Sequence, residues 1–163
     1  MAAVTLSGTD TIIINTYTLV NLADGNCGNL TFPNKIANAK IGKDGNALIA
    51  QNQTGKLAEL ELRILRGSPD DVFLNGLLNA QVTSFVAFPL LIGQVVKHLS
   101  SNSIVGGIST NQSISDAYSL SGGYFSSLVP VIVNPEGDTG QAVSVYKLEW
   151  VSALVTVPRT ISS

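Results

Sequence analysis

Charged side chains are scarce in this sequence of 163 residues, and so are the residues that build cross-links. Lysine, arginine, aspartate and glutamate together make up 12% of the chain, about half the roughly 25% of a typical soluble domain. The single cysteine, Cys27, permits no internal disulfide and no cysteine-based metal cage. The single histidine, His98, could act as the base of a Ser-His-Asp triad, but the sequence contains no Gly-x-Ser-x-Gly nucleophile motif. We therefore expect no catalytic residues, no cofactor and no metal site.

Long apolar runs and targeting signals are also missing. The longest apolar run, residues 85–92, contains Pro89 and is too short to span a bilayer. Residues 1–5 lack the basic and apolar regions of a secretory signal peptide. The net charge is −2 and no basic patch stands out, which argues against specific nucleic-acid binding. We expect a protein that is made and kept in a cytoplasm and does not bind a membrane.

Serine, threonine, asparagine and glycine take the place of the missing charges. Such a surface is wettable yet costs little to desolvate, which suits a subunit that is covered by its neighbours. Between Leu99 and Pro135 the only charged residue is Asp116, and a long uncharged stretch of β-structure invites pairing with another chain. The alternatives are a secreted or merely charge-poor protein, and a hairpin whose apolar residues fold back on the core.

β-Branched and aromatic residues predict strands over most of the chain. The alternation is clearest in residues 57–65, where Glu59, Glu61 and Arg63 share one face and three apolar residues share the other. Serine, asparagine and glycine predict a loop or insertion at residues 100–115. The other predicted strands cover residues 11–18, 83–99, 117–133 and 142–155.

One helix is predicted at about residues 68–80. Ser68 is the expected N-cap and Pro69 occupies the first helical position. Asp70 and Asp71 lie in the first turn, where the helix dipole favours negative charge, and Asp71 completes a short-armed capping box with Ser68. The whole pattern predicts one mainly-β domain over residues 1–163, a β-sandwich or partly closed barrel with this helix packed on it.

Several strings, in this order and spacing, resemble the tail tube proteins of contractile-tailed bacteriophages. They are TDTIIIN at residues 9–15, LADG at 22–25, LTFPN at 30–34, KIGKDGN at 40–46, LELRILRGSPDD at 60–71 followed by Phe73-Leu74, LSGG at 120–123, NPEGD at 134–138 and QAVSVY at 141–146. Residues 100–115 and the C-terminal tail, residues 156–163, fit the resemblance least.

The resemblance implies a virion structural protein that forms six-fold rings stacked into a tail tube. Each subunit would add its sheet to a continuous lumenal barrel, with the helix outside. The implied partners are further copies of the chain, the tail sheath, the baseplate hub and the tape-measure protein. DNA would pass through the lumen without specific binding, and the tail would assemble in the host cytoplasm.

Two sets of residues carry hypotheses about contacts. Glu59, Glu61 and Arg63 are the candidates for the lumenal face, because a mildly acidic wall repels phosphate. The resemblance also implies a long loop that reaches the next ring, which we place at residues 42–55. Its candidate contact residues are Lys43, Asp44, Asn46, Asn52 and Gln53.

Other readings of the sequence remain open at this point. One is the inner tube of a related contractile injection system or tailocin, which would share fold and assembly. Another is a monomeric β-barrel that binds a ligand. A third is a hydrolase that uses Glu59 and Glu61, although alternation along a strand explains that spacing equally well.

Overall fold

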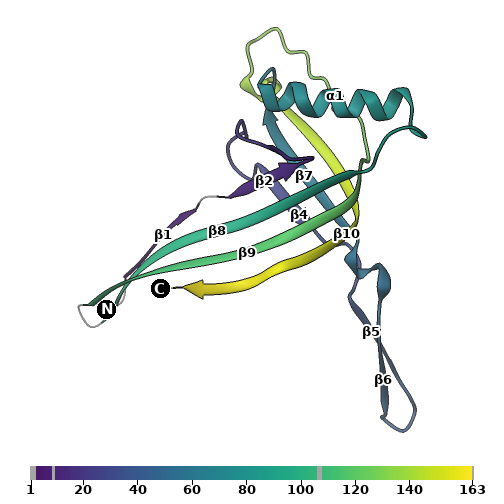
Figure 1. The fold of residues 1–163 in the computed structure, drawn as a ribbon, viewed down its shortest axis with the longest axis vertical. Coiled ribbons are helices and arrows are strands. Elements are labelled where there is room, and N and C mark those ends of the chain that lie inside the picture. The colour runs from purple at the N-terminus through teal and green to yellow at the C-terminus, as the bar shows by residue number, and fades with distance from the viewer. Residues whose placement is uncertain (1–2, 9, 106–107, 163) are drawn as a thin grey trace.

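A computed structural model describes residues 3–8, 10–105 and 108–162 of the chain (Figure 1). Its helices within these ranges are α1 (Pro69–Thr83) and the short 3-10 helices η1 (Gln53–Lys56) and η2 (Thr139–Ala142). The strands are β1 (Ala3–Gly8), β2 (Thr11–Ile14), β3 (Tyr17–Thr18), β4 (Gly28–Thr31), β5 (Ala37–Ile41), β6 (Ala47–Gln51), β7 (Ala58–Leu65), β8 (Leu91–Val105), β9 (Ile108–Phe125) and β10 (Val143–Ser162). The predicted mainly-β class with one packed helix is confirmed.

Eight of these strands form one antiparallel sheet that curls on itself, in the order β3-β2-β8-β9-β10-β7-β4, with β1 also paired to β8. Strands β5 and β6 form a separate two-stranded sheet. Helix α1 lies across one end of the curl (Figure 1). Of the two architectures predicted, the partly closed barrel is therefore the one observed.

Residues 17–23, which we call the closing segment, connect β2 to β7 across the opening of the curled sheet. Near its start, the Leu19 N–H donates to the carbonyl of Ile12 in β2 (3.0 Å). Further along, the Leu65 N–H at the end of β7 donates to the carbonyl of Asn21 (3.1 Å). The segment is thus bonded first to β2 and then to β7.

Asp70 fastens the closing segment to the helix. Its fully buried carboxylate accepts hydrogen bonds from the Tyr17 hydroxyl (2.9 Å) and from the backbone N–H groups of Val20 (2.6 Å) and Asn21 (2.5 Å). The bond to Asp70 also raises the pKa of the Tyr17 hydroxyl. The sequence indicated only a helix-dipole role for Asp70. It did not predict this contact with the closing segment.

The core lies between the curled sheet and the helix. The apolar face of β7 is buried there as the alternation predicts, together with Leu74 and Leu78 of α1 and Trp150 of β10. Glycine is needed beside the indole, because a Cβ at Gly123 would lie 2.3 Å from the Trp150 ring and one at Gly93 would lie 3.0 Å away. Overpacking of that size displaces side chains or backbone.

The helix begins as predicted, with a small change in its cap. The Ser68 hydroxyl accepts from the Asp71 N–H (3.3 Å). The Asp71 carboxylate accepts from the N–H of Gly67 (2.9 Å) rather than from Ser68, so the capping box is displaced by one residue. Burial acts to raise the pKa of Asp71, but its hydrogen bonds, first that from Gly67 and then that from Tyr146, hold it below the usual value.

The helix ends at Thr83, beyond the predicted end near Ala80. In its last turns the buried Gln81 side chain exchanges two hydrogen bonds of 2.8 Å with the backbone of Phe125, at the end of β9. This tertiary contact holds the final turn on the sheet, and no local pattern in the sequence predicts it.

The predicted loop at residues 100–115 is wrong, because these residues continue β8 and β9. The two strands pair in register from Lys97↔Asp116 to Val105↔Ile108, and residues 106–107 lie outside the described ranges. The predicted C-terminal tail at 156–163 is also strand up to Ser162, paired with β9, and residue 163 is not described. Long-range pairing overrides the weak local preference of serine and asparagine for loops.

Three of the predicted strands are too long. Residues 11–18 are broken at Asn15 and Thr16, whose φ values of 49° and 70° form the two-residue turn between β2 and β3. Residues 83–90 hold the last residue of α1 and a connection that contains Pro89, and residues 126–133 are irregular around Pro130. Proline cannot donate to a sheet ladder, which explains both interruptions.

The anchoring role of Asp70 gives a stability prediction. Asp70→Ala removes the acceptor of the partly buried Val20 and Asn21 N–H groups, so the free energy of unfolding should fall by roughly 2 kcal/mol. The control Asp24→Ala, at an exposed position, should change it by less than about 0.5 kcal/mol. Equal urea midpoints for the two variants would contradict the anchoring role.

Candidate assembly surfaces

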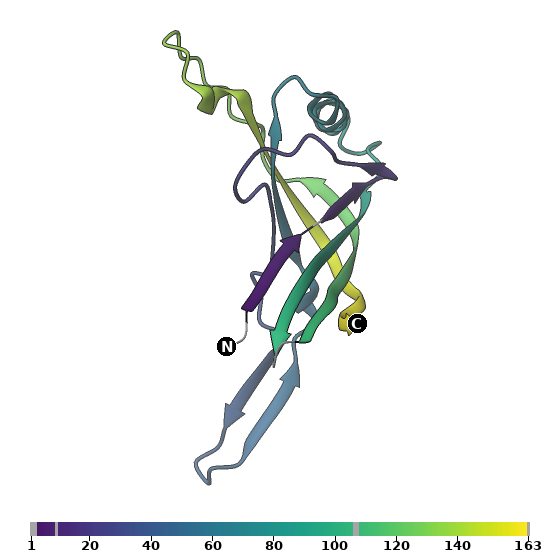
Figure 2. The same cartoon turned by 90° about the vertical axis from the view of Figure 1, so that its left-hand side faces the viewer.

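The two-stranded hairpin β5–β6 projects away from the eight-stranded sheet (Figures 1 and 2). Every residue of both strands is exposed, including Ile41 (71%), Leu48 (71%) and Ile49 (73%). An isolated two-stranded hairpin is at best marginally stable in water, and exposed apolar patches mark interaction sites. We call residues 35–56 the arm. The predicted loop at 42–55 is therefore part of a longer hairpin, whose first strand begins at Ala37.

The predicted contact residues fall at two places along the arm. Lys43, Asp44 and Asn46 form its tip, where the Asp44 carboxylate accepts from the backbone N–H (3.2 Å) and the side-chain amide (2.6 Å) of Asn46. These bonds lower the pKa of Asp44. Asn52 and Gln53 lie at the base instead, and the Asn52 amide donates to a backbone carbonyl across that base (2.7 Å). Asn52 therefore also holds the arm together.

The outward face of β7 carries Glu59, Glu61 and Arg63 together, as predicted. The register with β10 places Glu149 opposite Glu59 and Lys147 opposite Glu61. Three acidic and two basic side chains leave this face with a net charge of −1. The face is therefore only weakly acidic, as β7 alone indicates, because Lys147 offsets the charge that Glu149 adds.

Tyr124 extends the same polar face onto β9. Its hydroxyl donates to Glu149 (2.5 Å), and that bond raises the pKa of Tyr124. A shallow groove of about 240 Å³ crosses the face between Asn29 on β4 and Glu149 on β10. Its lining is mainly polar and charged, so the groove does not suit an apolar ligand.

Beyond the barrel, parts of four strands continue as a separate extension, which we call the distal sheet. It consists of β1, residues 99–105 of β8, residues 108–121 of β9 and residues 151–162 of β10. Strand β10 pairs with β7 only as far as Trp150↔Ala58, whereas it pairs with β9 up to Ser162. Within the described residues, β1 pairs with β8 alone. The distal sheet is thus open along both outer edges.

The β10 edge of the distal sheet is long and largely uncharged. Val151, Leu154 and Val155 are exposed by 59%, 48% and 54%, and Arg159 is the only charged residue in 151–162. Pro158 lies within this strand, a position that is tolerated at a sheet edge or a bulge. Exposed edges of this kind are templates for pairing with another chain.

A further surface is the loop at residues 126–142, which we call the apical loop. It projects from the end of the barrel opposite to the arm (Figures 1 and 2). Leu128, Val131, Ile132 and Val133 are exposed there by 68%, 68%, 56% and 86%. The loop is nevertheless braced by backbone N–H bonds to the side chains of Asn134, Asp138 and Gln141.

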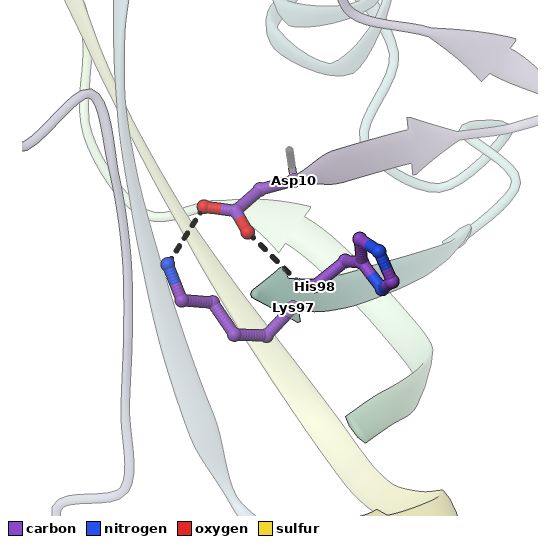
Figure 3. Close-up of polar contacts among 3 residues, drawn as sticks. All are labelled: Asp10, Lys97 and His98. Carbon is purple, nitrogen blue, oxygen red and sulfur yellow. Dashed lines mark hydrogen bonds and ion pairs between the residues drawn. The ribbon is translucent and has the colours of Figure 1, made fainter. Parts of the chain in front are cut away.

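Asp10 fills the interruption between β1 and β2, which both pair with β8 (Figure 3). Its carboxylate accepts from the His98 backbone N–H (3.1 Å) and from the Lys97 ammonium (2.8 Å). The imidazole of His98 points away from this carboxylate (Figure 3). The Asp10 carboxylate thus accepts the β8 backbone N–H that a paired strand would otherwise bind, at the point where the distal sheet begins.

Over the described part of the chain, no three histidine, cysteine, aspartate or glutamate side chains are grouped so that they could hold a metal ion. In the same ranges, no helix has the length and apolar character that crossing a bilayer requires.

No family model matches the sequence, and no curated protein matches it at a significant level.

The isolation of the arm gives a second prediction. Replacing residues 37–51 by an Asn-Gly turn keeps the base closed, because the Asn52 N–H bond to the Ile36 carbonyl (2.8 Å) remains. The truncated chain should unfold at the same urea midpoint as the full chain, since the arm strands bury nothing. Its self-association should nevertheless weaken, as measured by sedimentation velocity. A large loss of stability, or unchanged association, would contradict this assignment.

Proposed function

We propose that the chain is a structural subunit that assembles with its own copies into six-fold rings, which stack into the tail tube of a contractile-tailed bacteriophage. The observation that carries the proposal is the distal sheet, which is open along both edges. A subunit with two different open edges joins its neighbours head to tail, and such contacts generate closed rings or filaments. Closure into a barrel is also the way in which β-proteins remove exposed edges.

In the proposed ring, β1 of one subunit pairs with residues 151–162 of the next. Both are edge strands of the same four-stranded sheet, so each junction continues that sheet into the neighbour. Backbone hydrogen bonds supply the affinity in this mode of association. The scarcity of charge along the β10 edge keeps the desolvation cost of the junction low.

The step from a self-assembling ring to a phage tail tube rests on the sequence resemblance. It assigns the sheath to the outside of the rings, the baseplate hub and tape-measure protein to tube assembly, and DNA to the lumen. In this account the protein acts as a passive conduit and performs no catalysis.

Ring formation is tested by charging the β10 edge. Val151→Lys with Leu154→Lys places two ammonium groups in the proposed junction and should abolish the ring species in mass photometry. The control Val72→Lys with Asn75→Lys adds the same charge at two exposed positions of α1 and should leave rings intact. Rings formed equally well by both variants would overturn the proposed junction.

The predicted lumenal role of Glu59 and Glu61 has its own test in an assembled phage. Glu59→Lys with Glu61→Lys makes this face basic, so DNA phosphates should be retained and ejection slowed, measured as the rate of genome release. Glu59→Lys replaces a like-charge pair with Glu149 by an opposite-charge pair, whereas Glu61→Lys does the reverse with Lys147, so the two effects on folding should largely cancel. Normal ejection with intact tubes would exclude these residues from the lumen.

A further inference from the structure

The arm and the apical loop project from opposite ends of the molecule and carry opposite charge. We propose that the arm of one copy docks onto the apical loop of the next copy along the tube axis. This inference rests on the proposed function, since it names the surface that receives the arm when rings stack. Its occupant is a second copy of this chain.

The charges of the two projections are complementary. The arm carries Lys35, Lys40, Lys43 and Lys56 against the single Asp44, a net charge of +3. These are four of the nine basic residues of the chain, and all four are exposed. Four cations therefore lie on a projection whose two strands are wholly exposed.

The apical loop has the opposite sign. Between Asp116 and Lys147 the only charged residues are Glu136 and Asp138, so the loop carries a net charge of −2. Three charged residues lie beside it: Arg66, whose backbone N–H donates to the carbonyl of Ala142, Asp71, which lines the same hollow as Arg66, and Lys147, whose backbone carbonyl accepts from Ser126 at the start of the loop. Arg66 and Asp71 offset each other, and the single charge of Lys147 leaves this end of the molecule acidic.

Both projections also expose the apolar side chains that a stable contact requires. The arm offers Ile36 (74%), Ile41, Leu48 and Ile49, and the apical loop offers Leu128 and residues 131–133. Apolar residues inside a charged rim form the usual anatomy of a specific interface. The loop is braced by its own side-chain hydrogen bonds and Val129 packs on the core, so it presents a largely ordered receptor.

Opposite charge at opposite ends also gives the stack a direction. Two arms meeting would place +3 against +3, and two apical loops would place −2 against −2. Like charges facing each other across an interface cost several kcal/mol, so only the head-to-tail arrangement is favourable. Rings would therefore all point the same way along a tube.

A charge exchange tests the contact. Lys40→Glu with Lys43→Glu changes the net charge of the arm to −1, and Glu136→Lys with Asp138→Asn changes that of the loop to +1. Asparagine at 138 retains the cap on the Gly140 N–H. Each change alone should raise the critical concentration for tubes by at least about tenfold, while rings still form because the sheet edges are untouched.

The decisive variant combines both changes in one chain. Its arm and loop are again opposite in sign, so tubes should return to near the wild-type critical concentration. The control Lys40→Arg with Lys43→Arg keeps the charge and should stack normally. If the combined variant forms rings that do not stack, or if the separate variants stack as the wild type does, the arm does not dock on this loop.

A disulfide experiment separates this inference from the ring proposal. One chain carries Cys27→Ser with Lys43→Cys, and a differently tagged chain carries Cys27→Ser with Glu136→Cys. Oxidation of the mixture should give a covalent heterodimer, because docking brings the arm of one chain beside the apical loop of the other. A heterodimer without rings would support the arm contact and overturn the ring. Rings without a heterodimer would do the reverse.

Discussion

The architecture depends on a carboxylate that is removed from water. Asp70 takes two backbone N–H groups and one hydroxyl from the closing segment, and its own helix begins beside it. These bonds fix the place where the sheet edges meet and, with the Gln81 contact at the far end, the position of α1 across the barrel. Because buried polar groups must be paired, this arrangement has few alternatives.

The partly closed barrel is well packed, but three other parts of the molecule leave strand edges or apolar side chains uncovered. The distal sheet has two open edges, the arm buries none of its strand residues, and the apical loop presents four exposed apolar side chains. A monomer gains nothing from these features, because exposed edges and apolar patches favour aggregation. In an assembly each becomes a contact, with the rigid barrel holding them in fixed relative positions.

The sequence predicts what local patterns encode. Alternation placed Glu59, Glu61 and Arg63 on one face of β7, and the Ser68-Pro69 pair located the start of α1. It failed where distant residues decide the structure: Asp70 binds a segment about fifty residues away, and residues 100–115 become strand only because β8, β9 and β1 pair there. The family resemblance implied that the arm is a loop that reaches the next ring. Its hairpin of two strands was not predicted. The first half of the apical loop, residues 126–133, was predicted to be strand, and the charge of the loop becomes meaningful only beside the arm.

The central claim is that the fold is completed by further copies of itself. Negative-stain electron microscopy of the purified chain across a concentration series tests it most directly. The account predicts rings above a threshold concentration and, at higher concentration, hollow tubes built from stacked rings. Monomeric particles at every concentration, with the arm and the distal sheet left uncovered, would contradict it.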